Sequence, residues 1–150
     1  MKKLFALSLG LIVVILVHAQ AQNLVDWNFS AKKINSTTYE IYLTANLEPG
    51  WHVYSQSTPD GGPLPTTISY AKNPLVSLNG KAKEVGKLEQ RFEEIFGVDV
   101  KQFSDKVSFV QTIQIKGKVK TSLTGNVEFM TCNDRECMPP TTQKFSIALN

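Results

Sequence analysis

The sequence has only a small excess of positive over negative charge, and it has few cysteines. The 150 residues include 16 Lys and Arg against 13 Asp and Glu, a net charge of +3. Without Lys2 and Lys3 the counts are 14 and 13, or +1. Nucleic acids and anionic membrane surfaces attract proteins with a large positive excess, so neither is expected as a partner. Two cysteines, Cys132 and Cys137, are too few for a disulfide-rich scaffold but sufficient for one bridge.

The first residues have the pattern of a secretion signal. Lys2 and Lys3 precede an apolar run over Leu4–Val17, and Ala19-Gln20-Ala21 places small residues where a signal peptidase reads them. A membrane anchor is the alternative, but a run of about 14 residues is short of the ~20 that span the hydrocarbon layer. We therefore expect residues 1–21 to be removed. Residues 22–150 should form one domain, without a membrane span, in a compartment where disulfides persist.

Histidine is also scarce, because His52 is the only one left once residues 1–21 are removed. A blue-copper site needs two histidines and a cysteine, and the sequence lacks the nucleophile elbow of a Ser-His-Asp hydrolase. Asp60-Gly61-Gly62 indicates a turn, since the Lys-Ser/Thr of a phosphate-binding loop is missing. We expect no metal site and no cofactor, and we interpret His52 as a strand side chain.

Short alternating segments separated by turn residues dominate the rest of the chain. Over Tyr39–Leu47, apolar side chains occupy every second position, which is typical of a half-buried strand. Similar segments recur to the end of the chain and predict an all-β antiparallel sandwich of seven to nine strands. Gln111 is an exception, because it is a polar residue in the apolar phase of Val107–Ile115. Lys87–Phe96 is predicted to be an irregular loop with at most one helical turn.

The two cysteines lie on either side of a predicted turn. Asn133 and Asp134 are turn formers, and a four-residue hairpin loop would place Cys132 directly opposite Cys137. Facing residues of an antiparallel pair have Cα atoms about 4.5–5.5 Å apart, within the range of a disulfide. The bridge could be a structural staple, although closing so short a loop stabilises a fold by only about 2 kcal/mol. It could instead be redox-active, because a short loop at the end of a sandwich exposes sulfur to a partner.

Four segments resemble one protein family. Gly50–Tyr54 resembles its Gly-aromatic-x-hydrophobic-Tyr strand, Glu93–Gly97 its cap loop, and Val107–Ile115 the strand that follows. The run from Cys132 to Cys137, continued by Met138-Pro139-Pro140, resembles a redox pair followed by two prolines. The family is the N-terminal periplasmic domain of the DsbD thiol:disulfide interchange proteins, also known as a disulfide-corrector domain. The likeness extends over roughly residues 27–149.

The resemblance implies an immunoglobulin-like sandwich in the periplasm that relays two electrons by dithiol–disulfide exchange. A thioredoxin-like protein would supply the electrons, and periplasmic thioredoxin-fold proteins would accept them. By position, Cys137 would be the attacking thiol and Cys132 the resolving one. A cap loop would shield the pair and open when a partner docks. This loop consists of Glu93, Glu94, Ile95, Phe96 and Gly97. His52 would be a strand side chain beside it.

Two departures from the family leave other functions open. Four residues separate the cysteines, one fewer than in the best-known members. The best-known member also continues into a membrane domain and a thioredoxin-like domain that this sequence does not contain, so a separate electron donor is expected. A secreted binding module with a structural disulfide is the alternative function. An isomerase is a weaker option, because the chain lacks a Cys-x-x-Cys motif at a helix start.

Overall fold

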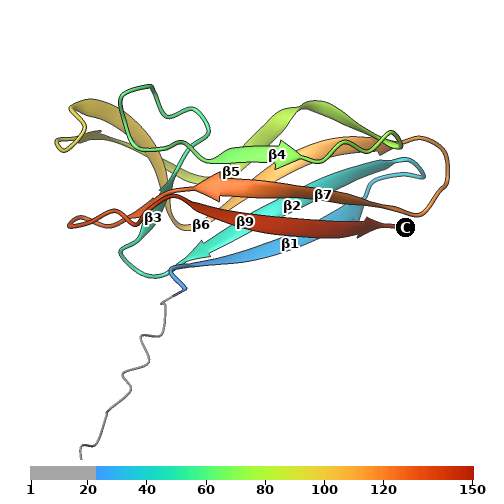
Figure 1. The fold of residues 1–150 in the computed structure, drawn as a ribbon, viewed down its shortest axis with the longest axis horizontal. Helices are drawn as coiled ribbons and strands as arrows, with labels where there is room; N and C mark the ends of the chain where they lie inside the picture. Colours follow the sequence, from blue (N-terminus) through green and yellow to red (C-terminus); the bar gives the residue numbers. More distant parts are fainter. Residues whose placement is uncertain (1–22) are drawn as a thin grey trace, which may run out of the picture.

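The computed structural model describes residues 23–150, and every regular element in that range is a β-strand. The expected signal peptide lies outside the described residues. In the described part, no helix is long and apolar enough to cross a membrane. The strands shown in Figure 1 are β1 (Val25–Lys33), β2 (Thr38–Leu47), β3 (His52–Tyr54), β4 (Thr67–Tyr70), β5 (Val76–Glu93), β6 (Val98–Ile115), β7 (Thr121–Phe129), β8 (Thr131–Cys132) and β9 (Thr141–Leu149).

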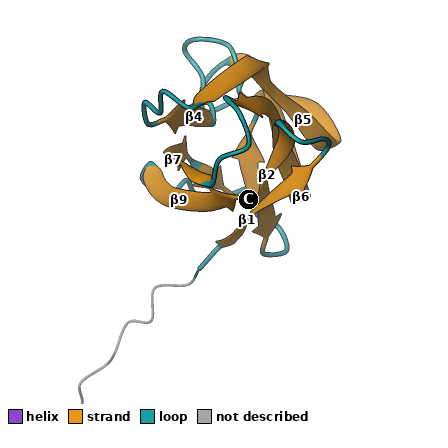
Figure 2. Cartoon of the chain, turned by 90° about the vertical axis from the view of Figure 1, so that its right-hand side faces the viewer, coloured by secondary structure: helices purple, strands orange, loops and turns teal. Residues whose placement is uncertain are grey.

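These strands form two antiparallel sheets that are stacked as a sandwich. The larger sheet has the order β1-β2-β6-β3-β8, with β5 paired to β6 as well, and the smaller sheet has the order β4-β7-β9. Figure 2 views the sandwich from one end, with β4, β7 and β9 on one side and β1, β2, β6 and β5 on the other. The predicted all-β sandwich of seven to nine strands is confirmed.

The main hydrophobic core lies between the two sheets. Alternation along β2 sends Ile41 and Leu43 into this core, while the residues between them remain partly exposed. Phe109 enters it from β6, and Leu123 and Leu149 enter it from the smaller sheet. The period-two pattern over Tyr39–Leu47 therefore identifies the inward face of β2 correctly.

Gln111 is buried in this apolar phase because the neighbouring strand supplies partners for its amide. The residue is only 1% exposed. Its Nε2 donates to the backbone oxygens of Asn79 and Gly80, at 3.1 and 3.3 Å. These two oxygens lie where the register of β5 against β6 shifts, between Asn79 and Lys83. A hydrogen-bonded amide at this irregularity avoids the cost of a buried polar group without a partner.

The expectation of an irregular loop over Lys87–Phe96 is wrong. β5 continues to Glu93, and residues 94–97 form a tight turn that leads directly into β6. Residues 87–104, which we call the hairpin arm, project beyond the sandwich at the upper left of Figure 1. Most side chains of residues 87–93 are exposed on both faces. This part of β5 therefore lacks the apolar alternation by which a half-buried strand is identified.

Candidate functional site

Cys132 and Cys137 form a disulfide. The segment that precedes β9 and carries both residues lies at the same end of the molecule as the hairpin arm (Figure 1). An isolated β-bridge pairs the two residues, with an S–S distance of 2.07 Å and a Cα–Cα distance of 4.0 Å. The side-chain oxygen of Asn133 accepts hydrogen bonds from the backbone N–H groups of Arg135 and Glu136, at 2.8 and 2.9 Å. These bonds fix the turn. The disulfide-closed hairpin therefore forms as the sequence predicted.

The two cysteines differ sharply in exposure. Cys137 is exposed, whereas Cys132 is only 1% exposed. Cys132 belongs to a small hydrophobic cluster with Tyr54 and Val100, against which Val98 also packs. Since Val98 and Val100 come from β6, the hairpin arm contributes to the cluster that contains Cys132, together with Tyr54 of β3. A molecule approaching this end of the sandwich therefore reaches Cys137 first.

A side-chain contact links the hairpin arm to the cysteine loop. Arg91, near the end of β5, places Nη1 3.1 Å from Oδ1 of Asp134, which lies between the two cysteines. The Nε of Arg91 is also 3.4 Å from a carboxylate oxygen of Glu93. The hydrogen bond to Asp134 raises the pKa of Arg91, so this side chain stays charged. The ion pair therefore holds the arm and the loop beside each other.

A neutral histidine–tyrosine pair lies next to the buried cysteine. His52, 3% exposed, is directly opposite Cys132 in the pairing of β3 with β8. Its Nε2 is 3.1 Å from the hydroxyl of Tyr54. Burial, assisted by the charge of Arg91, lowers the pKa of His52 to about 4, and burial raises the pKa of Tyr54 to about 12. Both side chains are therefore neutral at neutral pH.

The sequence placed His52 in a strand beside the cap region but did not pair it with Cys132. Its position beside Cys132 depends on the pairing of two strands that are far apart in sequence, which no local pattern reveals. One signal was present in the sequence, because His52 and Tyr54 are two residues apart in a strand and so must share a face. The cross-strand neighbour of that face, Cys132, could not be predicted.

The residues expected in a cap loop form the tip of the hairpin arm. The backbone oxygen of Glu93 accepts hydrogen bonds from the N–H groups of Phe96 and Gly97, at 3.1 and 2.8 Å, and these close the turn. Phe96 is half-buried, whereas Glu94 and Ile95 are exposed, Ile95 to 72%. The cluster around Cys132 includes Val98 and Val100 of β6, whose part in the site the sequence did not indicate.

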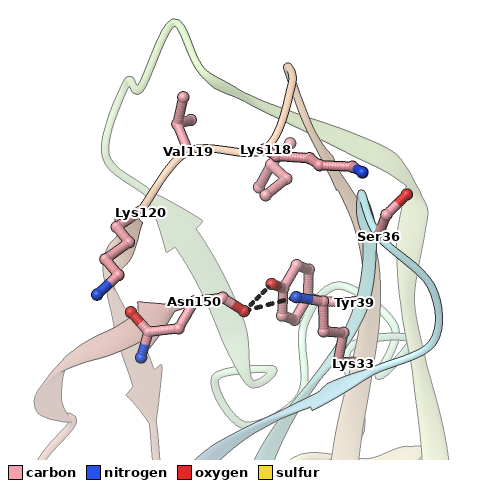
Figure 3. A pocket seen from close by; sticks show the side chains of 8 residues that line it. Lys33, Ser36, Tyr39, Lys118, Val119, Lys120 and Asn150 are labelled. Carbon is pink, nitrogen blue, oxygen red and sulfur yellow. Dashed lines mark hydrogen bonds between the residues drawn. The ribbon is translucent and has the colours of Figure 1, made fainter.

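The opposite end of the sandwich carries a hollow of about 430 Å³ bordered by lysines (Figure 3). Lys33 Nζ donates to the backbone oxygen of Asn150 at 2.8 Å, and the hydroxyl of Tyr39 donates to the same oxygen. These groups thus hold residue 150 against β1 and β2.

Among residues 23–150, no group of three or more His, Cys, Asp or Glu side chains is arranged to hold a metal ion.

Comparison with models of protein families identifies one family for this chain. The family model described as the N-terminal part of the thiol:disulfide interchange protein DsbD matches residues 20–149. The reduced DsbD N-terminal domain of Neisseria meningitidis has a similar structure, with a TM-score of 0.58 and 14% identity over 87% of this chain and 90% of that chain. The N-terminal periplasmic domain of ScsB from Proteus mirabilis has a TM-score of 0.56 and 16% identity, over 89% of this chain and 49% of that chain.

A third similar structure is described as a complex between the DsbD N-terminal and PilB N-terminal domains of Neisseria meningitidis. Its TM-score is 0.53 and its identity 11%, over 85% of this chain and 84% of that chain. No curated protein matches the sequence. The structural likenesses show a common immunoglobulin-like fold, and the family model extends over nearly all of the described residues. With its paired cysteines on that fold, this chain belongs to the family of DsbD N-terminal domains of thiol:disulfide interchange proteins.

Proposed function

We propose that this chain carries two electrons between proteins by opening and closing its Cys132–Cys137 disulfide. The observation that supports this most strongly is the difference in exposure between the two residues, with Cys137 at the surface and Cys132 buried. Thiol–disulfide exchange needs one accessible sulfur to meet the partner and a second sulfur within reach to release it. A bridge that only stabilises the fold does not require this difference.

The exchange balances as a transfer of two electrons. In the reduced chain, the thiolate of Cys137 attacks a partner's disulfide, and the partner's other sulfur leaves and takes a proton from water. Cys132 then loses its proton to water, and its thiolate attacks Cys137. The Cys132–Cys137 bond forms, the bond to the partner breaks, and the partner's second thiolate takes up a proton. The chain is oxidised and the partner's disulfide is reduced.

The hairpin arm serves as the cap in this proposal. Val98 and Val100 pack in the cluster that contains Cys132, and Ile95 or Phe96 at the tip is the residue that we expect to shield the sulfurs. Replacing Ile95 and Phe96 together with alanine should therefore speed the alkylation of the reduced protein by iodoacetamide. An unchanged rate would mean that the tip has no shielding role.

The partners that fit this chemistry are thioredoxin-fold proteins of the periplasm, with a thioredoxin-like donor and thioredoxin-fold acceptors. The neisserial structure described as a complex of a DsbD N-terminal domain with a PilB N-terminal domain supports docking of a separate domain onto this fold. A signal peptide over residues 1–21 would deliver residues 22–150 to that compartment. The domain of ScsB, which is described as periplasmic, is consistent with this location.

The reduction potential of the disulfide separates this function from that of a binding module. Structural disulfides of secreted proteins usually have potentials below about −300 mV, whereas exchange-active ones lie higher. Equilibration with glutathione buffers should therefore give a value above that limit. A bridge that stays oxidised at every physiological glutathione ratio would contradict the proposal and favour a secreted binding module with a structural disulfide.

Two single variants test the roles of the cysteines. Cys132→Ala leaves the exposed sulfur without a resolving partner, so it should accumulate a mixed disulfide with an oxidised thioredoxin-fold protein. Cys137→Ala leaves only the buried sulfur, so it should accumulate at least tenfold less mixed disulfide than Cys132→Ala does. The two variants serve as matched controls, because each retains one cysteine of the same hairpin. Equal trapping by both would contradict the assignment of Cys137 as the attacking thiol.

A further inference from the structure

His52 is a buried imidazole that the exchange steps above do not use. It lies in β3, directly opposite Cys132 in β8, and directly opposite residues of an antiparallel pair have Cβ atoms about 4.5–5.5 Å apart. Tyr54, two residues along the same strand, belongs to the cluster that encloses Cys132. The imidazole, the phenol and the buried cysteine therefore share one face of the larger sheet.

The contact between His52 and Tyr54 favours one of the two neutral forms of the imidazole. A phenol O–H is the better donor of the two neutral groups, and an unprotonated imidazole nitrogen is the better acceptor. Nε2 and the hydroxyl oxygen are 3.1 Å apart, and on this chemical ground we assign Tyr54 as the donor and Nε2 as the acceptor. The imidazole proton then resides on Nδ1. This leaves His52 with one N–H group free to donate to a neighbour.

We propose that the Nδ1–H of His52 donates a hydrogen bond to the sulfur of Cys132 when the disulfide is open, and so stabilises the thiolate of the resolving cysteine. The inference rests on the proposed exchange function. Burial in an apolar cluster disfavours a thiolate, and the cluster around Cys132 is of this kind. A preoriented neutral donor offsets this penalty without placing a second charge in the cluster. Tyr54 acts through His52 as a positioning residue, because its hydroxyl fixes the tautomer.

The step exchanges no proton with the imidazole. Cys132 gives its proton to water, the thiolate accepts the N–H bond of His52, and the thiolate then attacks Cys137 of the mixed disulfide. His52 begins and ends the step neutral, in agreement with its pKa of about 4. The charged groups that act on His52 are Arg91, which lowers its pKa, and Asp134 and Glu89, which raise it.

The test uses Cys137→Ser as background, so that Cys132 is the only thiol of the chain. Thiolate absorbance in the ultraviolet, followed against pH, gives the pKa of Cys132. Adding His52→Phe should raise this pKa by about one unit, or about tenfold less thiolate at a given pH, since hydrogen bonds to charged groups are worth more than neutral ones. His52→Gln keeps an N–H donor and should raise it by less.

Tyr54→Phe provides a second test that does not remove the imidazole. Without the hydroxyl, the imidazole proton of His52 is no longer held on Nδ1. The pKa of Cys132 should therefore rise, but by less than in His52→Phe. In the His52→Phe background, Tyr54→Phe should have no further effect. In the wild-type chain, nitrogen NMR of His52 should show the proton on Nδ1. An Nε2–H tautomer, or an unchanged pKa of Cys132 in a folded His52→Phe variant, would overturn the inference.

These outcomes are distinct from failure of the exchange function. If the His52 variants shift the pKa of Cys132 but the wild-type chain reduces no thioredoxin-fold disulfide, the hydrogen bond exists and the proposed function is wrong. If exchange proceeds and the pKa does not respond, the function stands and the role of His52 is wrong. Near-ultraviolet circular dichroism of each variant shows whether the aromatic packing around Tyr54 has survived.

Discussion

β5 and β6 run through both the sandwich and the hairpin arm, but the two regions bury different kinds of side chain. Where β6 crosses the sandwich, it contributes Phe109 and Ile113 to a large apolar core. Where it enters the arm, it contributes Val100 to a small cluster containing Cys132, beside the buried Gln102, whose Oε1 has no hydrogen-bond partner. The large core supplies stability, and the small cluster holds reactive and polar groups that stability alone would not select.

The largest expected effect tests the sandwich side of this comparison. Phe109→Ala removes a completely buried ring from the main core and should lower the free energy of unfolding by about 3–5 kcal/mol. The reduction potential of the disulfide should be unchanged, because the ring lies in the other cluster. Urea unfolding and glutathione equilibration measure the two quantities. If the free energy of unfolding and the reduction potential both changed, the main core and the cluster around Cys132 would behave as one unit.

Removing the disulfide should have a smaller effect on stability and a complete effect on exchange. The double variant Cys132→Ser, Cys137→Ser opens a bridge with a sequence separation of only 5. The free energy of unfolding should therefore fall by about 2 kcal/mol, while reduction of a partner disulfide is lost. Urea unfolding of oxidised wild type and the variant gives the comparison. A loss as large as that from Phe109→Ala would favour a structural staple.

The pH dependence of unfolding should report on the arm end through His52. Burial first, and Arg91 second, hold its pKa at about 4, below the ordinary value of 6.5. As the pH falls below 6.5, His52 takes up a proton in the unfolded chain, whereas in the folded chain it stays neutral until about pH 4. The contribution of His52 to stability is therefore fully present above pH 6.5 and declines between pH 6.5 and about 4. Urea unfolding between pH 7 and pH 4 should show a shallower decline for His52→Gln. Parallel curves would contradict the burial of a neutral imidazole.

The smallest expected effect concerns the ion pair between the arm and the cysteine loop. Arg91 and Asp134 are both exposed, so Arg91→Gln should change the free energy of unfolding by less than about 1 kcal/mol. The pKa of His52 should rise, because the charge of Arg91 lowers it. Lys87→Gln is the matched control, since Lys87 pairs only with Glu89 among the described residues. Proton NMR of His52 against pH distinguishes the two variants.

Local patterns were sufficient to predict the sandwich and the disulfide. The alternation over Tyr39–Leu47 identified the buried face of β2, and Asn133 formed the turn that its side chain favours. Both features are decided by neighbouring residues. Cys132 and Cys137 could be paired from the sequence for the same reason, because a short hairpin determines which residues face each other.

Features that depend on distant segments could not be predicted in this way. The strand over residues 87–93 has no alternation, because both of its faces are largely exposed, and only its pairing with β6 makes it a strand. The burial of Gln111 requires two backbone oxygens of β5. The position of His52 beside Cys132 requires β3 and β8 to become neighbours. Each of these depends on register between strands, which composition does not encode.

The small size of the disulfide loop has a consequence for the direction of electron flow. Opening a bridge between residues only 5 apart in sequence frees little of the backbone, and the strands that carry the loop are held by the sandwich. We expect the oxidised and reduced chains to present nearly the same surface. A partner would then meet both forms with similar affinity, and the relative potentials of donor and acceptor, not recognition of shape, would decide which way the electrons move.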